Sequence, residues 1–242
     1  MSSKYIYEQI IKRVHPEWLD FFNDNRKELE SILEQVNKDI DDNKTIFPNP
    51  VHIFRTLFYF GLTETKLVLL GQDPYINSEI HQNQKIPQAC GMSFGIPKIH
   101  KKIPPSLKNI FKEIKSCYPQ SIIPSHGFLK RWVRQEHILL LNSALTVIEG
   151  KSNSHQHLWS EFTDKLIQYI SKNSPHTVFL LMGNFAIGKS KLIDITKHKI
   201  FTTIHPSPLS AFNGFFGCEV FLKINKYLET KNITTIRWLK QI

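Results

Sequence analysis

Four short apolar runs stand out along the chain, and each stops at a polar group. They cover residues 67–70, 138–141, 178–182 and 200–204. Runs of this kind are typical of strands buried on both faces, and such strands occur mostly in parallel sheets. The pattern therefore predicts an α/β fold built on a central, twisted, four-stranded parallel sheet.

Apolar residues at helical spacing predict helices around these strands. We expect helices over residues 17–40, 51–60, from 104 onward, 159–171, 189–196 and 217–228. Residues 71–102 show little periodicity and are predicted to form a long loop, which in a compact domain is usually functional or disordered. Alternating strands and helices favour right-handed crossovers and helices on both sheet faces, in a three-layer α/β/α arrangement.

The length and composition fit a single domain. The 242 residues contain no repeats or long linkers, so we expect one domain over residues 1–242. No apolar stretch approaches the ~20 residues that span a bilayer, and residues 1–14 have no secretory core, so we expect no membrane association. The scattered Cys90, Cys117 and Cys218 favour a reducing compartment without disulfides. We expect an intracellular protein, in the cytoplasm if prokaryotic and in the nucleus or host cytoplasm if eukaryotic or viral.

The charge is unevenly distributed. The formal net charge is +10, yet residues 17–42 hold nine acidic and three basic residues. Of the totals of 21 acids and 31 bases, this leaves 12 acids against 28 bases elsewhere. Such a cationic remainder suits a polyanion such as nucleic acid. The alternative is a lysine-rich surface that serves solubility or reflects an AT-rich genome.

The polar groups that end the four runs carry candidate chemistry. They are Gln72 and Asp73, Asn142, Gly183 and Asn184, and His205. Ligands of open parallel sheets bind beyond the carboxyl ends of the strands. A carboxylate, amides, a glycine turn and an imidazole are therefore expected at one edge, where they would suit a hydrogen-bonding ligand that becomes an anion.

Several motifs are similar to those of a known enzyme family. Gly71-Gln72-Asp73-Pro74-Tyr75 and His205-Pro206-Ser207-Pro208-Leu209-Ser210 resemble the two signature motifs of the family-1 uracil-DNA glycosylases. Pro104-Pro105-Ser106-Leu107 with Asn109-Ile110, the strand end Leu139-Leu140-Leu141-Asn142, and Gly214-Phe215-Phe216-Gly217-Cys218 resemble further stretches of that family. The resemblance runs in the expected order from about residue 16 to the C-terminus.

The resemblance implies a monomeric enzyme without a cofactor. It would flip deoxyuridine out of single- or double-stranded DNA and hydrolyse its N-glycosidic bond. The products would be uracil and an abasic site, in the first step of base excision repair. A protein inhibitor that mimics uracil or DNA is a further partner that the family suggests.

The same resemblance assigns roles to the two catalytic candidates. Breaking the bond leaves an electron-poor sugar and an anionic base, and a catalyst must stabilise both. Asp73 would stabilise the oxocarbenium-like sugar and orient water. His205 would donate a hydrogen bond to uracil O2, as a neutral imidazole. Without the motifs, a turn residue is an equally good interpretation of Asp73, and a structural hydrogen-bonding group is the more frequent role of a lone histidine such as His205.

Other residues would read the base. Asn142 would recognise uracil N3–H and O4, a pattern that cytosine inverts. Tyr75 would occupy the space of a thymine methyl group, Phe94 would stack on the flipped base, and Gln72 belongs to the same binding set. The structural alternatives are a capping Asn and an ordinary core Phe.

A third group would contact DNA. By resemblance, Leu209 would be pushed into the duplex stack as the base leaves. Small hydroxyls, glycine backbone and a proline-rich loop would hold the phosphates. This phosphate-contacting set is Pro104, Pro105, Ser106, Gly183, Asn184, Ser207 and Ser210.

The chain departs from the family pattern in three places. Ile76 stands where the family usually has His, and Asn184 where it usually has Ser. The loop over residues 76–92 is also longer than usual and contains His81 and Cys90. A metal site in this loop is conceivable, but no paired ligand spacing accompanies these residues, so we predict a solvated insertion and no metal.

Three alternative functions remain open at this point. Residues 183–190 read Gly-x-x-x-x-Gly-Lys-Ser, the phosphate-binding loop of nucleotide hydrolases, with a predicted strand before it and a helix after it. The absence of an evident companion acid and the late position in the chain count against this reading. A DNA-binding subunit without catalysis is disfavoured by the joint presence of Asp73, Asn142 and His205. A glycosylase of broader base range is disfavoured by Tyr75.

Overall fold

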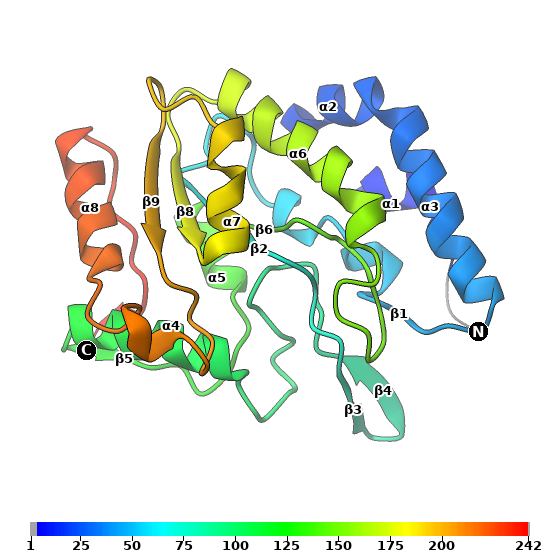
Figure 1. Cartoon of the computed structure of the whole chain (residues 1–242), viewed down its shortest axis with the longest axis horizontal. Coiled ribbons are helices and arrows are strands. Elements are labelled where there is room, and N and C mark those ends of the chain that lie inside the picture. Colours follow the sequence, from blue (N-terminus) through cyan, green and yellow to red (C-terminus); the bar gives the residue numbers. More distant parts are fainter. Residues whose placement is uncertain (1–3, 242) are drawn as a thin grey trace.

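The central sheet has four parallel strands, as predicted. The computed structural model describes residues 4–241. The strands lie in the order β6 (Ile138–Asn142), β2 (Leu67–Gly71), β8 (Val178–Met182) and β9 (Lys199–Thr203). The register pairs Gly71 with Asn142 and Met182 with Thr203. The carboxyl ends of all four strands therefore meet at one edge, toward the bottom of Figure 1.

The strands differ in how far they are buried. Every residue of β2 and β8 is buried, and so is every residue of β6 except Asn142. Burial of successive residues, which point to opposite faces, requires cover on both faces of the sheet. The prediction of two buried faces is wrong for β9, where Lys199 and Thr202 are exposed. This strand lies at the sheet edge and has one neighbour.

Helices enclose the sheet. In Figure 1, α6 and α7 lie in front of the sheet. α8 lies at the outer side of β9, and α1 to α3 lie on the side of α6 that is away from β8 and β9. The bounds are α1 (Tyr7–Ile11), α2 (Leu19–Asp24), α3 (Arg26–Asp41), α4 (Pro105–Cys117), α5 (Lys130–Glu136), α6 (Gln156–Asn173), α7 (Asn184–Ile187) and α8 (Val220–Thr230). Short 3₁₀ turns are η1 (Pro16–Trp18), η2 (Pro50–His52), η3 (Arg55–Leu57), η4 (Gly188–Leu192) and η5 (Ala211–Asn213).

Three two-stranded pairs complete the fold. They are β1 (Ile46–Phe47) with β7 (Val147–Ile148), β5 (Ser121–Ile122) with β10 (Lys240–Gln241), and the hairpin of β3 (Ser78–His81) and β4 (Gln84–Pro87). All three pairs are antiparallel. The hairpin extends from the body of the molecule at the lower right of Figure 1.

Several predicted elements need correction. The helix expected over residues 17–40 is interrupted at Asn25, whose side-chain amide donates to the Phe21 carbonyl and ends α2. Residues 51–60 form the turns η2 and η3 instead of an α-helix. The helix expected at 189–196 is replaced by α7 and η4, over residues 184–192. The expected loop over 71–102 contains the β3–β4 hairpin, and α1 and α5 were not predicted.

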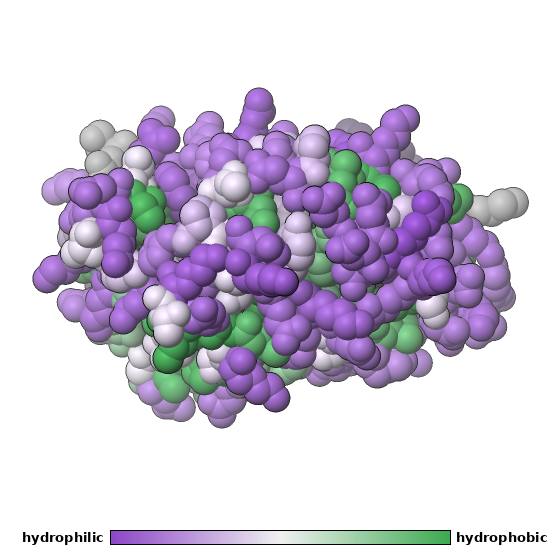
Figure 2. Space-filling model, turned by 90° about the horizontal axis from the view of Figure 1, so that it is seen from above, coloured by the Kyte–Doolittle hydropathy of each residue, from purple (hydrophilic) through white to green (hydrophobic). Residues whose placement is uncertain are grey.

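One large apolar core joins the sheet to the helices. The amphipathic α3 buries Leu29, Leu33 and Val36, and α6 buries Trp159 and Phe162. α3 lies against α6, and the fold encloses both rows of side chains in the same core. Seen from above, the surface in Figure 2 is largely hydrophilic with some hydrophobic groups. Within residues 4–241, no helix has the length and apolar character to cross a membrane.

Candidate active site

A cavity of about 270 Å³ opens at the carboxyl ends of β2 and β6. Its walls include seven of the predicted site residues: Gln72, Asp73, Tyr75, Phe94, Ser106, Asn142 and His205. The other seven, Pro104, Pro105, Gly183, Asn184, Ser207, Leu209 and Ser210, are not among its lining residues. The sheet thus brings the carboxylate, the amide and the imidazole to one cavity, although up to 132 residues separate them along the chain.

Among the described residues, hydrogen bonds hold one oxygen of Asp73, and the other has none. Its Oδ2 accepts hydrogen bonds from the Ser152 hydroxyl and the Asn153 backbone N–H, both at 2.8 Å. The exposed Gln72 supports this arrangement, because its amide donates to Asn153 Oδ1 at 2.7 Å. Two donors on one oxygen fix the plane of the carboxylate. Because Oδ2 and the plane of the carboxylate are fixed, the position of Oδ1 is fixed as well.

Ser152 and Asn153 were not identified from the sequence. They lie in the turn before α6 and approach Asp73 from 79 and 80 positions along the chain. Their only local signal is a polar Lys-Ser-Asn-Ser stretch after Gly150, which indicates a turn and no more.

His205 is held as a neutral imidazole by its backbone surroundings. The Ser207 backbone N–H donates to His205 Nδ1 at 3.1 Å, so Nδ1 acts as the acceptor and the proton is assigned to Nε2. Burial lowers the pKa of His205, which disfavours the charged ring. Nε2–H is therefore the donor that this side chain can offer to a ligand.

The absence of a side chain at Gly183 makes room for His205. The backbone of Gly183 has φ +84°, and a Cβ built there would lie 2.8 Å from the His205 Cβ. The Gly183 N–H donates to the Thr203 carbonyl, which joins the ends of β8 and β9. A glycine is required here for both reasons: the left-handed backbone and the close approach of the imidazole.

Asn142 lies over another glycine. Gly71 is its register partner on β2, and a Cβ at Gly71 would be 2.2 Å from Asn142 Oδ1. The missing side chain lets the Asn142 amide lie across the end of β2 and form part of the cavity wall. Its acceptor and donors are thereby offered to a ligand in the cavity.

Two aromatic side chains form another wall. The Tyr75 hydroxyl donates to the Phe94 carbonyl at 3.2 Å, and burial raises the pKa of Tyr75. Phe94 has φ 60°, a conformation that is strained for a residue with a side chain. Its ring centroid lies 6.1 Å from that of His205, with 36° between the ring planes. Ser93 holds this loop in place through bonds to the Leu69 and Leu140 carbonyls.

The loops outside the cavity are tied to one another. Ser207 and Ser210 share a hydrogen bond of 2.8 Å, and Ser210 also donates to the His205 carbonyl. Asn109 on α4 donates to the Pro206 carbonyl at 2.9 Å, so the Pro104–Pro105–Ser106 turn at the start of α4 is joined to the His205 loop. The buried Glu113, also on α4, accepts from the backbone of Gly217 and Glu219 and was not identified from the sequence.

Leu209 projects from this loop into solvent. It is 94% exposed, and Phe212 nearby in the chain is 80% exposed. A leucine packed against the following helix, the ordinary reading, would be buried. The exposed position is the one that a wedge into a duplex requires.

The glycine-rich stretch over residues 183–190 does not form a nucleotide-binding loop. In such loops the Lys and Ser begin the helix, whereas here α7 begins at Asn184 and both residues fall in η4. The Lys189 ammonium is bound to Asp164 at 2.6 Å, on α6. The commitment of this lysine to a carboxylate counts against the nucleotide-hydrolase alternative.

Ile76 has a packing role at the departure from the family pattern. It lines the cavity and packs beside Phe47, Ala89 and Val147, which form a small separate apolar cluster. The site thus has an apolar wall where the family usually has a histidine. Asn184, the second departure, is exposed at the first position of α7.

The fold and the cavity together define a class. This is an α/β enzyme domain in which a carboxylate, an amide and a neutral imidazole surround one cavity at the carboxyl ends of a parallel sheet. Residues 58–229 match the family model described as the uracil DNA glycosylase superfamily, and the chain belongs to that family.

Relatives and solved structures agree with this assignment. The chain is 41% identical to the uracil-DNA glycosylase of Francisella philomiragia, over 91% of this chain and 98% of that protein. It is 40% identical to the uracil-DNA glycosylase of Haemophilus influenzae strain PittEE, with the same coverage. The crystal structure of mimivirus uracil-DNA glycosylase superposes with a TM-score of 0.87 at 29% identity, covering 98% of this chain and 94% of that one. A mimivirus variant in complex with UGI gives 0.86 at 31% identity, covering 93% and 88%.

Proposed function

We propose that this protein excises uracil from DNA by hydrolysing the N-glycosidic bond of deoxyuridine, and that the cavity at the ends of β2 and β6 is where it does so. The observation that carries the proposal is the meeting of Asp73, Asn142 and His205 around one cavity. As a DNA N-glycosylase, the enzyme leaves an abasic site, the starting point of base excision repair.

Asp73 acts on the sugar side of the bond. Its carboxylate stabilises the positive charge that develops on the sugar and orients the attacking water. Ser152 and Asn153 support this role, because they hold Oδ2 and thereby fix where Oδ1 can point. A group fixed before the reaction needs no reorganisation when the charge appears.

His205 and Asn142 act on the base. The neutral imidazole donates from Nε2 to uracil O2, where negative charge accumulates as the bond breaks. Asn142 reads N3–H and O4, so cytosine would leave its amide unpaired. Gln72 and Phe94 complete the binding set, with Phe94 beneath the base, and Tyr75 excludes a methyl group at C5. The cross-link from Tyr75 to the Phe94 carbonyl supports one rigid wall for the base.

The surrounding loops hold the DNA. Leu209 enters the stack as the base leaves it, for which its 94% exposure is suitable. Phosphates are held by the linked turns that contain Ser106, Ser207 and Ser210, with Pro104, Pro105, Gly183 and Asn184 beside them. The bond between Asn109 and the Pro206 carbonyl supports a joint action of the two turns.

We propose further that the DNA-binding face of this monomeric enzyme can be occupied by an acidic protein that mimics DNA. The support is that a mimivirus neighbour was solved in complex with UGI. The exposed Leu209 and the basic remainder of the chain offer the apolar and cationic contacts that such a partner needs.

The decisive test compares the wild type with Asp73→Asn on a uracil-containing oligonucleotide in EDTA, with alkali to break abasic sites. We expect strand breaks with the wild type and a loss of about 10²–10⁴ in single-turnover rate with the variant, because a neutral amide cannot stabilise the developing cation. Binding, followed by fluorescence anisotropy, should change little. An unchanged rate would remove Asp73 from the mechanism, and a wild type without breaks would overturn the function.

A further inference from the structure

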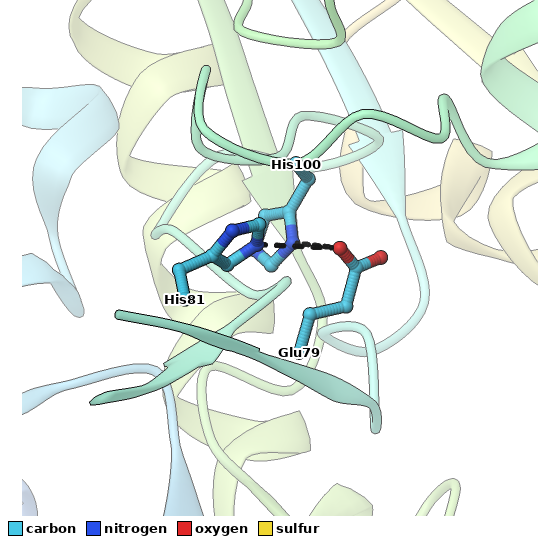
Figure 3. Close-up of side chains that lie close together, drawn as sticks. All are labelled: Glu79, His81 and His100. Atoms are coloured by element: carbon cyan, nitrogen blue, oxygen red, sulfur yellow. Dashed lines mark ion pairs between the residues drawn. The ribbon is translucent and has the colours of Figure 1, made fainter. Parts of the chain in front are cut away.

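The β3–β4 hairpin presents its polar side to the protein and an apolar side chain to water. Glu79 and His81 are two positions apart on β3 and therefore lie on the same face of the strand. Figure 3 shows both side chains pointing toward His100, which comes from the segment before α4. Ile80, on the opposite face, is 76% exposed. This is the reverse of the usual arrangement in a hairpin packed on a core.

Three potential metal-ligand atoms converge at this point. His81 Nε2 lies 3.3 Å and His100 Nδ1 lies 3.2 Å from the same Glu79 oxygen, Oε2. All three atoms are within 4.8 Å of one another. In a tetrahedral zinc site with bonds of about 2.05 Å, neighbouring ligand atoms are about 3.3 Å apart. The two nitrogen-to-oxygen distances therefore match the edges of such a tetrahedron.

The two imidazole nitrogens are buried, and both lie within ion-pairing distance of the Glu79 carboxylate. Among the residues that the structure describes, neither His81 Nε2 nor His100 Nδ1 reaches hydrogen-bond geometry with a partner, although each is shielded from solvent. The His100 side chain is fully buried. Buried polar atoms of this kind are costly unless a ligand or ion satisfies them.

The other nitrogen of His100 indicates which atom is free to bind a cation. Its Nε2 lies 3.1 Å from the Pro87 carbonyl, which can only accept, so Nε2 carries the proton. Nδ1 is then the ring atom that faces the Glu79 oxygen, in the position of a metal ligand. Metal-binding histidines commonly donate their second N–H to a carbonyl in this way.

We propose that Glu79, His81 and His100 form a Zn²⁺ site, with a fourth position left to water. Two imidazoles and a carboxylate are ligands that zinc accepts. The ion would clamp the hairpin to the segment that leads into Pro104–Pro105–Ser106. The hairpin buries no residue of β3 or β4, so it has little apolar packing of its own to hold it there.

Within residues 76–92, His81 and Cys90 show no paired ligand spacing, so the sequence alone predicts no metal in this loop. The third ligand comes from outside that range, and the buried Cys90 is not part of the cluster. None of the three ligands lines the catalytic cavity. The clamp is therefore separate from the excision chemistry, and its test does not depend on activity.

Zinc uptake by the full-length protein tests the site directly. Protein treated with EDTA and desalted is titrated with Zn²⁺ against a chromogenic chelator. We expect one ion per chain, with at least about a tenfold loss of affinity in Glu79→Gln and His81→Gln. The matched control is His157→Gln, the same replacement at an exposed histidine on α6. No stoichiometric uptake by the wild type, or uptake that His81→Gln leaves unchanged, overturns the proposal.

Two further measurements separate this site from adventitious surface binding. Co²⁺ in place of zinc should give the intense visible absorption of a tetrahedral ion in the wild type and lose it in His81→Gln. Zinc should also slow tryptic cleavage at the exposed Lys98, Lys101 and Lys102, which flank His100, in the wild type only. Equal cleavage with and without zinc would mean that the ion does not clamp this segment. An ordinary ion pair between a protonated His100 and Glu79 would give neither signal.

Discussion

At the residue scale, the site depends on single hydrogen bonds that restrict what each group can do. The Ser207 backbone N–H donates to His205 Nδ1 and so fixes the tautomer of the imidazole. Ser152 and Asn153 both donate to Asp73 Oδ2 and so fix the orientation of the carboxylate. A side chain restrained in this way has already given up the rotamers that a flexible one would lose on binding substrate. In the proposed mechanism, uracil excision thus depends on contacts made by the backbone and by residues that do not touch the base.

The pH dependence of the reaction should reveal the restraint on His205. Burial holds its pKa below the ordinary value of 6.5. Protonation would also put a hydrogen on Nδ1 against the Ser207 N–H. We therefore expect a single-turnover rate that is level from pH 8 to about 6.5 and falls in more acidic solution, with this fall reduced in His205→Gln.

The contribution of His205 to folding stability should also decrease as the pH falls. Below pH 6.5 the unfolded chain takes up a proton at this histidine that the folded chain resists, so stability decreases as the pH falls from 6.5 through the folded pKa. A wild-type rate that rises as the imidazole is protonated would contradict the neutral-imidazole assignment.

The same contacts explain which site residues could be predicted from the sequence. Asp73, Asn142 and His205 each end an apolar run, so the predicted strands place them at one sheet edge. Ser152, Asn153 and Glu113 act through contacts 79 to 106 positions along the chain, and no local pattern specifies such an approach. They became recognisable only when the loops were placed in space.

At the element scale, glycine turns set where the site residues lie. Gly183→Ala should lower the single-turnover rate markedly and cost about 1–3 kcal/mol of unfolding free energy, because its φ of +84° is strained for alanine and the new Cβ would meet His205. Rapid-quench kinetics and denaturant unfolding measure the two effects.

Gly188, five positions along the same segment, provides the matched control. A Cβ there meets nothing within 4 Å, and its backbone is right-handed helical. Gly188→Ala should leave the rate unchanged and keep or slightly raise the stability. Equal effects of the two substitutions would show that the space beside His205 is not critical.

The elements that were not predicted from the sequence lack a clear local signal. The β3–β4 hairpin turns through Gln82 and Asn83, both with positive φ, and the usual glycine signal for this turn is absent. α5 has only seven residues, too few to establish a periodicity. In contrast, β2, β6 and β8 were predicted within one residue because strands buried on both faces tolerate no polar interruption.

At the scale of the whole molecule, charge is separated along the fold. The acid-rich residues 17–42 form α2 and α3, and α2 lies at the end of the molecule opposite the carboxyl ends of the strands (Figure 1). The more basic remainder of the chain carries the loops that we propose to bind DNA. Such a distribution orients an approaching polyanion toward the cavity and away from α2.

Salt dependence tests this picture. With the slow Asp73→Asn variant, the affinity for a uracil-containing duplex should fall at least about tenfold between 50 and 200 mM salt, because phosphate contacts release counterions. Lys108→Ala, in the first turn of α4, should reduce the slope of log affinity against log salt by about one. Lys38→Ala on α3 is the control and should leave the slope unchanged. Affinity that is insensitive to salt would rule out phosphate contacts as the main source of binding.

The pairing of Gly71 with Asn142 has a consequence for how base selectivity can change. The amide proposed to read the base is fixed by strand alignment, and a shift of one position would turn it to the opposite side of the sheet. In the proposed mechanism, the choice between uracil and cytosine thus depends on the alignment of two buried strands. Grafted loops could alter how this enzyme grips DNA, but a change from uracil to cytosine would require a new side chain at position 142.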